Sequence, residues 1–258
     1  MEVVICKDYA AMSQAAARVV AEVVNHKPNA VLGFATGSSP VGLYKELARL
    51  HREEGLDFSK VTTFNLDEYV GLPADHPQSY RRFMNENLFT HINVPVQNTH
   101  VPSGTATSPK AFCEGYEKQI RDAGGIDLQV LGIGSDGHIA FNEPGSSLGS
   151  RTRRVTLTEQ TLDDNARFFK KKSDVPRHAI SMGVGTILEA RKLLMVVNGE
   201  NKAPALAAAI EGPITSMITA SALQLHPDAV VFVDEDAAAQ LKMRDYYEWI
   251  QKQAKAGD

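Results

Sequence analysis

The stretch that decides the fold is DLQVLGIGSDGHIAFNEP, residues 127–144. Its first part, Asp127–Ile133, is nearly all apolar, which is typical of a strand buried on both faces of a parallel sheet. Glycines at positions 132, 134 and 137 follow, and they let the backbone turn tightly and approach a ligand. Ligands of parallel α/β sheets bind outside the carboxyl ends of the strands. The stretch therefore predicts a central strand that ends in a ligand-binding loop.

Short apolar runs alternate with helical patterns on both sides of this stretch. The further predicted strands are Val3–Cys6, Ala30–Ala35, Val61–Leu66, Lys192–Val197 and Ala229–Val233. The predicted helices are Tyr9–Lys27, Ser39–Glu54, Ser79–His91, Pro109–Ala123, Pro204–Glu211 and Asp234–Lys255. This alternation predicts a doubly wound, mostly parallel sheet with helices on both faces, a Rossmann-like α/β fold. No linker or repeat interrupts it, so residues 1–258 are expected to form a single domain.

Composition excludes several classes of function. The chain has 258 residues, with 27 Lys and Arg against 31 Asp and Glu, a net charge of −4. A nucleic-acid or anionic-membrane surface would need a basic excess, so neither partner is expected. Cys6 and Cys113 lie far apart and match no zinc or disulfide pattern. The first residues do not resemble a secretory signal, and no stretch has the length of a membrane span, so the predicted location is the cytoplasm.

The loop after the second predicted strand is rich in small hydroxyl residues. Thr36, Gly37, Ser38 and Ser39 precede Pro40 at the start of a predicted helix. Ser39 suits the N-cap and Pro40 the first helical position. The free N–H groups of a helix start, together with these hydroxyls, can bind an anion such as phosphate. A plain strand-to-helix turn is an equally good explanation of this segment alone, and the spacing is not that of a Walker loop.

Two adjacent carboxylates follow the third predicted strand. Neighbouring side chains on a strand point to opposite faces, so only one of Asp67 and Glu68 is expected to face a given pocket. Such a carboxylate could be a general base, with its pKa set by burial and neighbours. Taken alone, a solvated acidic loop or a helix cap is the more common explanation.

The glycine loop itself carries the densest chemistry. Asp136, His138 and Glu143 fall within eight residues, and imidazole beside carboxylates is a plausible proton shuttle. A structural loop with a satisfied histidine is the main alternative. Asp-x-His with one Glu matches no strong metal pattern, so no metal is expected. The glycine spacing is not a dinucleotide fingerprint either.

Together these segments resemble the glucosamine-6-phosphate deaminase family over nearly the whole chain. The motifs that carry the resemblance are FNLDEYVGL (64–72), HPQSY (76–80), GSDGHIAFNEP (134–144), SRTR (150–153), NARFF (165–169), MGVGT (182–186) and LQLHP (223–227). The related 6-phosphogluconolactonases share the fold and a DGH-type segment, but not the longer run through Phe141–Pro144. The resemblance implies isomerisation and deamination of glucosamine 6-phosphate to fructose 6-phosphate and ammonia, without a cofactor.

The resemblance also implies roles for individual residues. Asp67 is expected to move a proton between C2 and C1, and Asp136, His138 and Glu143 to open the sugar ring. Arg167 and Lys202 are expected to hold the phosphate together with the loop of residues 36–39. Residues 162–182 resemble a mobile lid.

Some family members are activated by N-acetylglucosamine 6-phosphate at a subunit interface. Ser146, Ser147 and Arg153 fit that allosteric pattern, but Val155 stands where such members carry a lysine. Allosteric activation and a homo-oligomer therefore both stay open. The alternatives to a deaminase are a lactonase or another hexosamine-phosphate enzyme, and a sugar-phosphate-sensing regulatory domain.

Overall fold

A computed structural model describes residues 1–257 of the chain and the side chains of residues 1–253. The strands are β1 Glu2–Cys6, β2 Val31–Phe34, β3 Thr62–Asn65, β4 Asp67–Tyr69, β5 Thr99–His100, β6 Leu128–Leu131, β7 Arg153–Thr156, β8 His178–Ser181, β9 Lys192–Val197 and β10 Ala229–Asp234. The α-helices are α1 Tyr9–His26, α2 Val41–Glu54, α3 Tyr80–Asn87, α4 Pro109–Asp122, α5 Glu159–Ala166, α6 Val184–Leu188, α7 Ala203–Glu211 and α8 Arg244–Gly257. Short 3₁₀ helices lie at 89–91, 96–98, 172–174, 200–202, 219–225 and 237–240.

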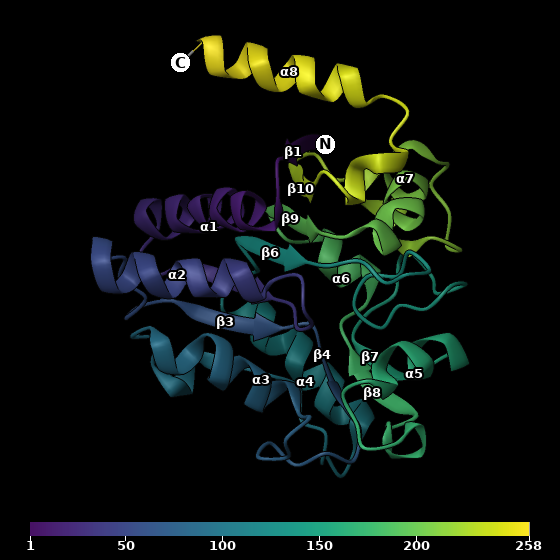
Figure 1. Ribbon diagram of the computed structural model, residues 1–258. Helices are drawn as coiled ribbons and strands as arrows, with labels where there is room; N and C mark the ends of the chain where they lie inside the picture. The colour runs from purple at the N-terminus through teal and green to yellow at the C-terminus, as the bar shows by residue number, and fades with distance from the viewer. Residues whose placement is uncertain (258) are drawn as a thin grey trace.

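Seven strands form one parallel sheet in the order β1-β10-β9-β6-β2-β3-β5. Successive residues of its strands point to opposite sides. In β10, for example, Val230 and Phe232 pack in the core with α1 and α2, whereas Val231 and Val233 pack in the core with α6 and α7. Helices therefore cover both faces (Figure 1), and the predicted doubly wound α/β fold is confirmed.

A second, smaller sheet was not predicted. Strands β4, β8 and β7 form an antiparallel sheet beside the main one. The chain passes from β3 in the large sheet to β4 in the small sheet across the single residue Leu66. Leu66 N donates to Phe34 O of β2, and Met182 N donates to Leu66 O. The small sheet escaped prediction because β7 is short and charged, and because β8 lies within the segment expected to be a lid.

The C-terminal segment also differs from its prediction. A single helix was expected over Asp234–Lys255, but Asp234 ends β10 and its carboxylate accepts from Ala237 N and Gly199 N. The helix α8 begins only at Arg244 and lies over the edge strand β1 (Figure 1). There Gln251 accepts from Ile5 N and donates to Ile5 O, so a side chain satisfies the open sheet edge.

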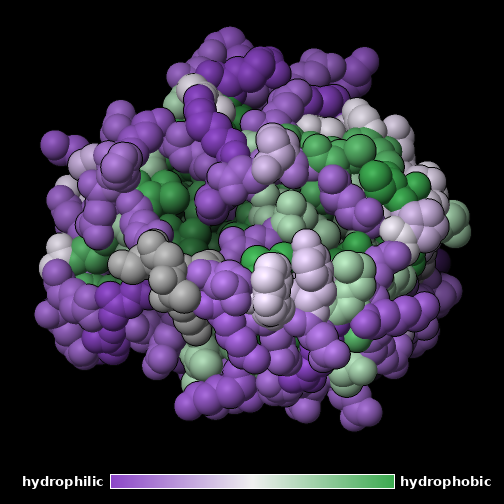
Figure 2. Space-filling model, turned by 90° about the horizontal axis from the view of Figure 1, so that it is seen from above, coloured by the Kyte–Doolittle hydropathy of each residue, from purple (hydrophilic) through white to green (hydrophobic). Residues whose placement is uncertain are grey.

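The surface seen from the side of α8 is mainly hydrophilic, with apolar side chains gathered in patches (Figure 2). Met217, Leu225, Tyr246 and Trp249 are among the large apolar side chains that are exposed. Among residues 1–257, each helix is too short or too polar to cross a bilayer.

Gly33 in β2 tests how tightly the sheet is packed. A Cβ atom added there would lie 1.9 Å from Oε1 of the fully buried Gln129. We expect Gly33→Ala to lower the free energy of unfolding by about 1–3 kcal/mol through overpacking. Urea denaturation measures it. The matched control is Gly115→Ala, an exposed site inside α4 with no atom within 4 Å of the new Cβ, which should be neutral or stabilising. A Gly33→Ala protein as stable as the control would contradict the packing described.

Candidate active site

A pocket of about 580 Å³ opens at the carboxyl ends of the central strands β2 and β6. From these two neighbours the chain builds the sheet in opposite directions, through β3 and β5 on one side and through β9 and β10 on the other. The loops that leave β2 and β6 consequently diverge and leave a crevice between them. Residues 35–41 and 132–135, which belong to these loops, line it. The site thus lies where the sequence predicted a ligand-binding loop.

Asp67 lies on the wall of the pocket, and its neighbour Glu68 does not line it. Glu68 points the other way, where its carboxylate accepts hydrogen bonds from the backbone N–H groups of Tyr69, Tyr80 and Arg81. It thereby fixes the start of α3, whose residues form another wall of the pocket. The alternation expected along this strand is therefore present, and the two adjacent carboxylates have different environments.

Asp67 is a buried acid with no cation beside it. Only 6% of the residue is exposed, and within the described chain neither a hydrogen bond nor an ion pair reaches its carboxylate. Burial, with a smaller effect from the charge of Glu68, raises its pKa to about 8. A carboxylate with a pKa near neutrality is suited to accept and return a proton at physiological pH.

His138 lines the same pocket as this acid and has two carboxylates close to its imidazole. His138 lines the pocket, whereas Asp136 and Glu143 do not. His138 Nδ1 lies 2.7 Å from Asp136 Oδ1, at an angle short of a well-aligned hydrogen bond, and 3.6 Å from Glu143 Oε2. Burial opposes ionisation of Asp136, but contacts with the imidazole and backbone N–H of His138 outweigh it and lower the pKa of Asp136. An imidazole backed by two carboxylates can take up and release a proton at the pocket surface.

The same three residues are the one set of ligand-type side chains in the described chain close enough to hold a metal ion, with donor atoms within 4.8 Å of one another. Two of them already accept hydrogen bonds from backbone N–H groups: Asp136 accepts from His138 N, and Glu143 accepts from Thr158 N. These bonds orient the carboxylates toward the imidazole, as a proton relay requires. The donor set therefore fits a relay without a metal.

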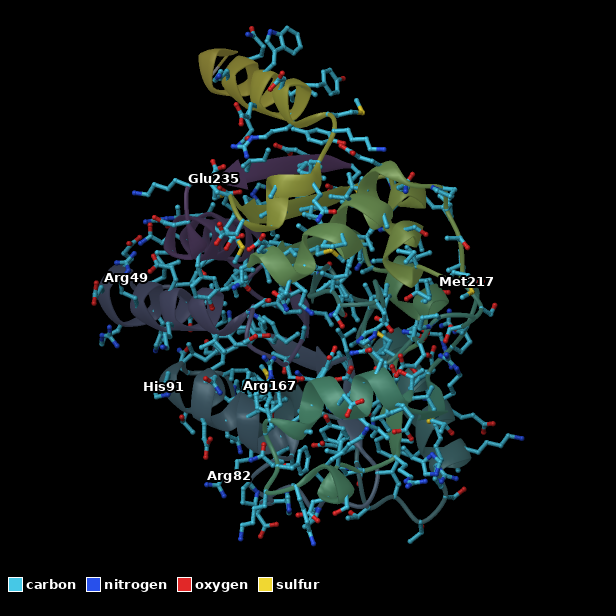
Figure 3. All side chains as sticks on the ribbon, turned by 45° about the vertical axis from the view of Figure 1, so that its right-hand side comes forward. Arg49, Arg82, His91, Arg167, Met217 and Glu235 are labelled. Carbon is cyan, nitrogen blue, oxygen red and sulfur yellow. The ribbon has the colours of Figure 1, made fainter. Side chains whose placement is uncertain are left out.

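Cationic side chains lie at another side of the pocket. Lys202 directly precedes α7 and is largely buried, and within residues 1–257 its ammonium group has no hydrogen bond or ion pair. Burial lowers its pKa. Arg167 is the C-cap of α5 and is exposed (Figure 3), with its guanidinium carbon 4.7 Å from the ring centre of Phe168. A buried ammonium without a partner is a strong indication of an anionic ligand.

Thr36, Gly37, Ser38 and Ser39 line the pocket as predicted, but the predicted helix start was wrong. The N-cap of α2 is Pro40, and the helix begins at Val41. Ser39 Oγ donates to Asn198 Oδ1 instead of capping the helix. Tyr9 holds this loop, because its hydroxyl lies 3.2 Å from the carbonyls of Ser38 and Ser39 and accepts from Gly42 N. The expected hydroxyl groups are thus present, on a turn held by a residue that the sequence did not single out.

Several pocket residues were not predicted. Thr161, Asp164 and Asn201 line the pocket outside the quoted motifs, and Ser135 lines it from within the glycine-loop motif, where it was given no role. Thr158 could have been found, because a threonine before Glu159 at the start of a polar helix is a typical N-cap, and its hydroxyl does accept from Thr161 N. Its backbone N–H donates to Glu143 Oε1 at 3.1 Å and so joins α5 to the relay.

Aromatic side chains join the segment after α5 to the pocket floor. Tyr69 packs against Tyr80, Phe141 and Phe169, with ring centres 4.9, 5.6 and 5.8 Å away. Phe169 belongs to the predicted lid, residues 162–182. Residues 178–181 of that segment form strand β8, and Met182 after it is fully buried. That end of the expected lid is therefore part of the small sheet.

The predicted allosteric residues lie behind the relay. Arg153 Nη1 donates to Asn142 Oδ1 at 2.9 Å, and Nη2 to Ser146 Oγ at 3.2 Å. Ser147 Oγ accepts from Gly149 N, and Val155 packs beside the apolar cluster around Tyr69 and Phe141. Arg153 and Ser146 thus contact each other, while Ser147 has a local bond.

Comparison with known proteins agrees with this geometry. The family model for glucosamine-6-phosphate isomerases and 6-phosphogluconolactonases matches residues 7–233. The chain belongs to this family. Among curated relatives, glucosamine-6-phosphate deaminase of Shewanella woodyi is 52% identical over 97% of this chain and 95% of its own. The deaminase of Clostridium perfringens is 52% identical over 94% of this chain and all of its own.

Solved structures divide the family further. A monomeric glucosamine-6-phosphate deaminase superposes with a TM-score of 0.92 and 46% identity, covering 93% of this chain and all of that one. A 6-phosphogluconolactonase from Trypanosoma brucei superposes with a TM-score of 0.74 at 22% identity, over 93% of this chain and 98% of that one. The lactonase therefore shares the fold, whereas the deaminase is similar in sequence as well.

The burial of Asp67 should make the free energy of unfolding depend on pH. Its folded pKa of about 8 lies above the ordinary unfolded value, so the native state keeps a proton that the unfolded state has lost. The protonated carboxyl group makes its full contribution to the free energy of unfolding below about pH 4. This contribution is lost as the pH rises toward about 8. We expect Asp67→Asn to be more stable than the parent by about 5 kcal/mol at pH 8, since the folded pKa lies about four units above the ordinary value at about 1.4 kcal/mol each, with little difference at pH 4.

Urea unfolding at the two pH values measures this difference. Asp75→Asn, at an exposed position before α3, is the matched control and should behave like the parent at both. A destabilised Asp67→Asn protein at pH 8 would mean that its ionised carboxylate is stabilised in the fold.

Proposed function

We propose that this protein is a glucosamine-6-phosphate deaminase, which isomerises the aldose to a ketose and releases its amino group as ammonia. The observation that carries the proposal is one pocket that combines a buried acid, an imidazole relay, and a lysine with no hydrogen bond or ion pair among the described residues. Proteins named for this activity are 52% identical to the chain over nearly its full length. Fructose 6-phosphate is the other product.

Ring opening comes first, because the substrate is mostly a closed ring. In the proposed mechanism His138 moves the proton at the ring oxygen. Asp136 and Glu143 support this by stabilising the imidazolium and fixing the ring from behind. The side chain lies at the pocket surface, where it can reach a bound sugar.

Proton transfer follows in the open-chain sugar. Asp67 removes the C2 proton and returns it at C1, which turns the 2-amino aldose into a 2-imino compound. Water then adds to C2, and the C–N bond breaks to give the ketone and ammonia. Asp67 must be ionised to act as this base. A pKa of about 8 in the empty pocket means that binding an aminated, positively charged substrate beside it would favour the required form.

The phosphate supplies orientation. Lys202, Arg167 and the loop of residues 36–39 are proposed to hold it, away from the reacting carbons. A charged anchor turns binding energy into alignment of C1 and C2 with the acid and the imidazole. Neither hydride transfer nor an electron sink enters this scheme, so the proposed reaction uses no cofactor.

The alternatives are less well supported. Several 6-phosphogluconolactonases of solved structure share the fold at 19–22% identity, against 46% for a deaminase. A sensing domain would need the phosphate and hydroxyl contacts, but not a buried acid in the same pocket as an imidazole relay. These residues together favour turnover.

The remaining expectations also belong to this proposal. A homo-oligomer stays an expectation, and the monomeric deaminase with nearly the same fold supports a site built by a single chain. The proposed lid is shortened from residues 162–182 to residues 162–177, because residues 178–181 form strand β8. Arg153 and Ser146 stay candidates for an activator site, and the cytoplasmic location stays a prediction.

An ammonia-release assay on the purified protein tests the function. Glucosamine 6-phosphate should yield ammonia and fructose 6-phosphate in equal amounts, and EDTA should leave the rate unchanged. Galactosamine 6-phosphate serves as the epimer control, and 6-phosphogluconolactone tests the lactonase alternative. Adding N-acetylglucosamine 6-phosphate measures activation. Lactone hydrolysis without ammonia release would overturn the proposal.

Substitution of the base separates binding from chemistry. Asp67→Asn should bind the sugar phosphate almost normally and abolish exchange of the C2 proton with deuterated solvent. In the parent, kcat/KM should rise with pH toward about 8, as Asp67 loses its proton. NMR follows the exchange, and exchange that persists in the variant would remove Asp67 from the mechanism.

Substitution of His138 isolates ring opening. His138→Gln should lower kcat by about 10²–10⁴-fold, the usual contribution of a general acid–base group. The KM should change much less, since the phosphate contacts remain. A kcat within about threefold of the parent would rule out this role.

A further inference from the structure

One acidic side chain lies among the pocket residues where a phosphate ligand would not favour it. Asp164 lines the same pocket as Arg167 and Lys202, three positions before Arg167 on α5. A carboxylate near a bound phosphate repels it, so the position needs an explanation. Asp164 belongs neither to the relay nor to the motifs that suggested the phosphate site.

Two hydrogen bonds fix the Asp164 carboxylate. Ser135 Oγ donates to Oδ2 at 2.5 Å, and Gln160 Nε2 donates to Oδ1 at 2.9 Å. Gln160 belongs to α5 itself, whereas Ser135 belongs to the glycine loop after β6. Within the described chain, the bond to Ser135 is therefore the one hydrogen bond that joins this side chain to the rest of the protein.

The charges around Asp164 are complementary to it when the pocket is empty. Lys202 has no hydrogen bond or ion pair within the described residues, and the charge of Asp164 opposes the loss of its proton on burial. Asp164 thus supplies part of the negative charge that the buried ammonium lacks. A phosphate bound in this pocket would supply more of it.

We propose that Asp164 is an affinity-setting residue of the phosphate subsite: Ser135 holds its carboxylate as a provisional counter-ion to Lys202, and the ligand's phosphate competes with it. The inference rests on the proposed function only in taking a sugar phosphate as the natural ligand. It also gives α5 a reason to lie over the empty pocket, since the bond to Ser135 holds the helix there until a phosphate arrives.

Calorimetric titration with inorganic phosphate tests the competition. We expect Asp164→Asn to bind phosphate about threefold to fivefold more tightly than the parent at fixed ionic strength, the effect of removing one partly solvated like charge. Asp163→Asn is the matched control, because it removes the same charge from the same helix. The Asp163 side chain is 57% exposed and pairs with Lys172, so that variant should bind phosphate like the parent.

The outcomes are distinct. Equal or weaker phosphate binding by Asp164→Asn overturns the proposal, and so does an equal gain in both variants, which would show a general effect of net charge. Hydrogen–deuterium exchange on Ser135→Ala tests the holding role, with faster exchange expected at residues 159–166 and unchanged exchange counting against it. The parent's ammonia release is measured separately, so failure of the deaminase function and failure of this inference can be distinguished.

Discussion

The site depends on the way the chain leaves one sheet and enters another at Leu66. The backbone N–H of Leu66 pairs with β2 of the large sheet, and its carbonyl accepts from Met182, beside the small one. These two hydrogen bonds fix the peptide groups on either side of Leu66, and Asp67 directly after it is buried. Glu68 reinforces this, since its carboxylate binds three backbone N–H groups on the opposite side of the strand. The raised pKa of Asp67 is a consequence of its burial at this junction between the two sheets.

Charge is distributed unevenly around the pocket. The buried acid has no cation beside it, and the buried Lys202 has no anion within hydrogen-bonding distance among the described residues. Letting the two groups neutralise each other would stabilise the fold but would leave a weaker base and a weaker anion site. A ligand that carries a phosphate at one end and an amino group near the other would complement both groups at once.

The sequence predicted six of the seven strands of the large sheet, because these six contain apolar runs that alternate with helical patterns. It missed the edge strand β5, which has only two residues, Thr99 and His100. It also placed the candidate loops correctly, since the carboxyl ends of parallel strands meet at one edge. The small sheet could not be predicted in this way. Strand β7 alternates half-buried with exposed residues, and β4 has three residues, of which two are acidic. Their pairing depends on β8, which is distant in sequence, and local patterns carry no information on such contacts. Ser39 fits the N-cap pattern, yet its hydroxyl bonds to Asn198, 159 positions away, so a tertiary contact replaced the local one.

Helix α5 connects the two halves of the proposed chemistry. Its first turn is joined to the relay through Thr158 and Glu143, and its last turn carries Asp164 and Arg167 into the pocket. If phosphate binding displaced the Asp164 carboxylate and moved this helix, the position of Glu143 would change as well. Glu143 lies 3.6 Å from His138 Nδ1, so the relay would change with it. Because one short helix contacts both ends, phosphate binding and the geometry of ring opening need not be independent.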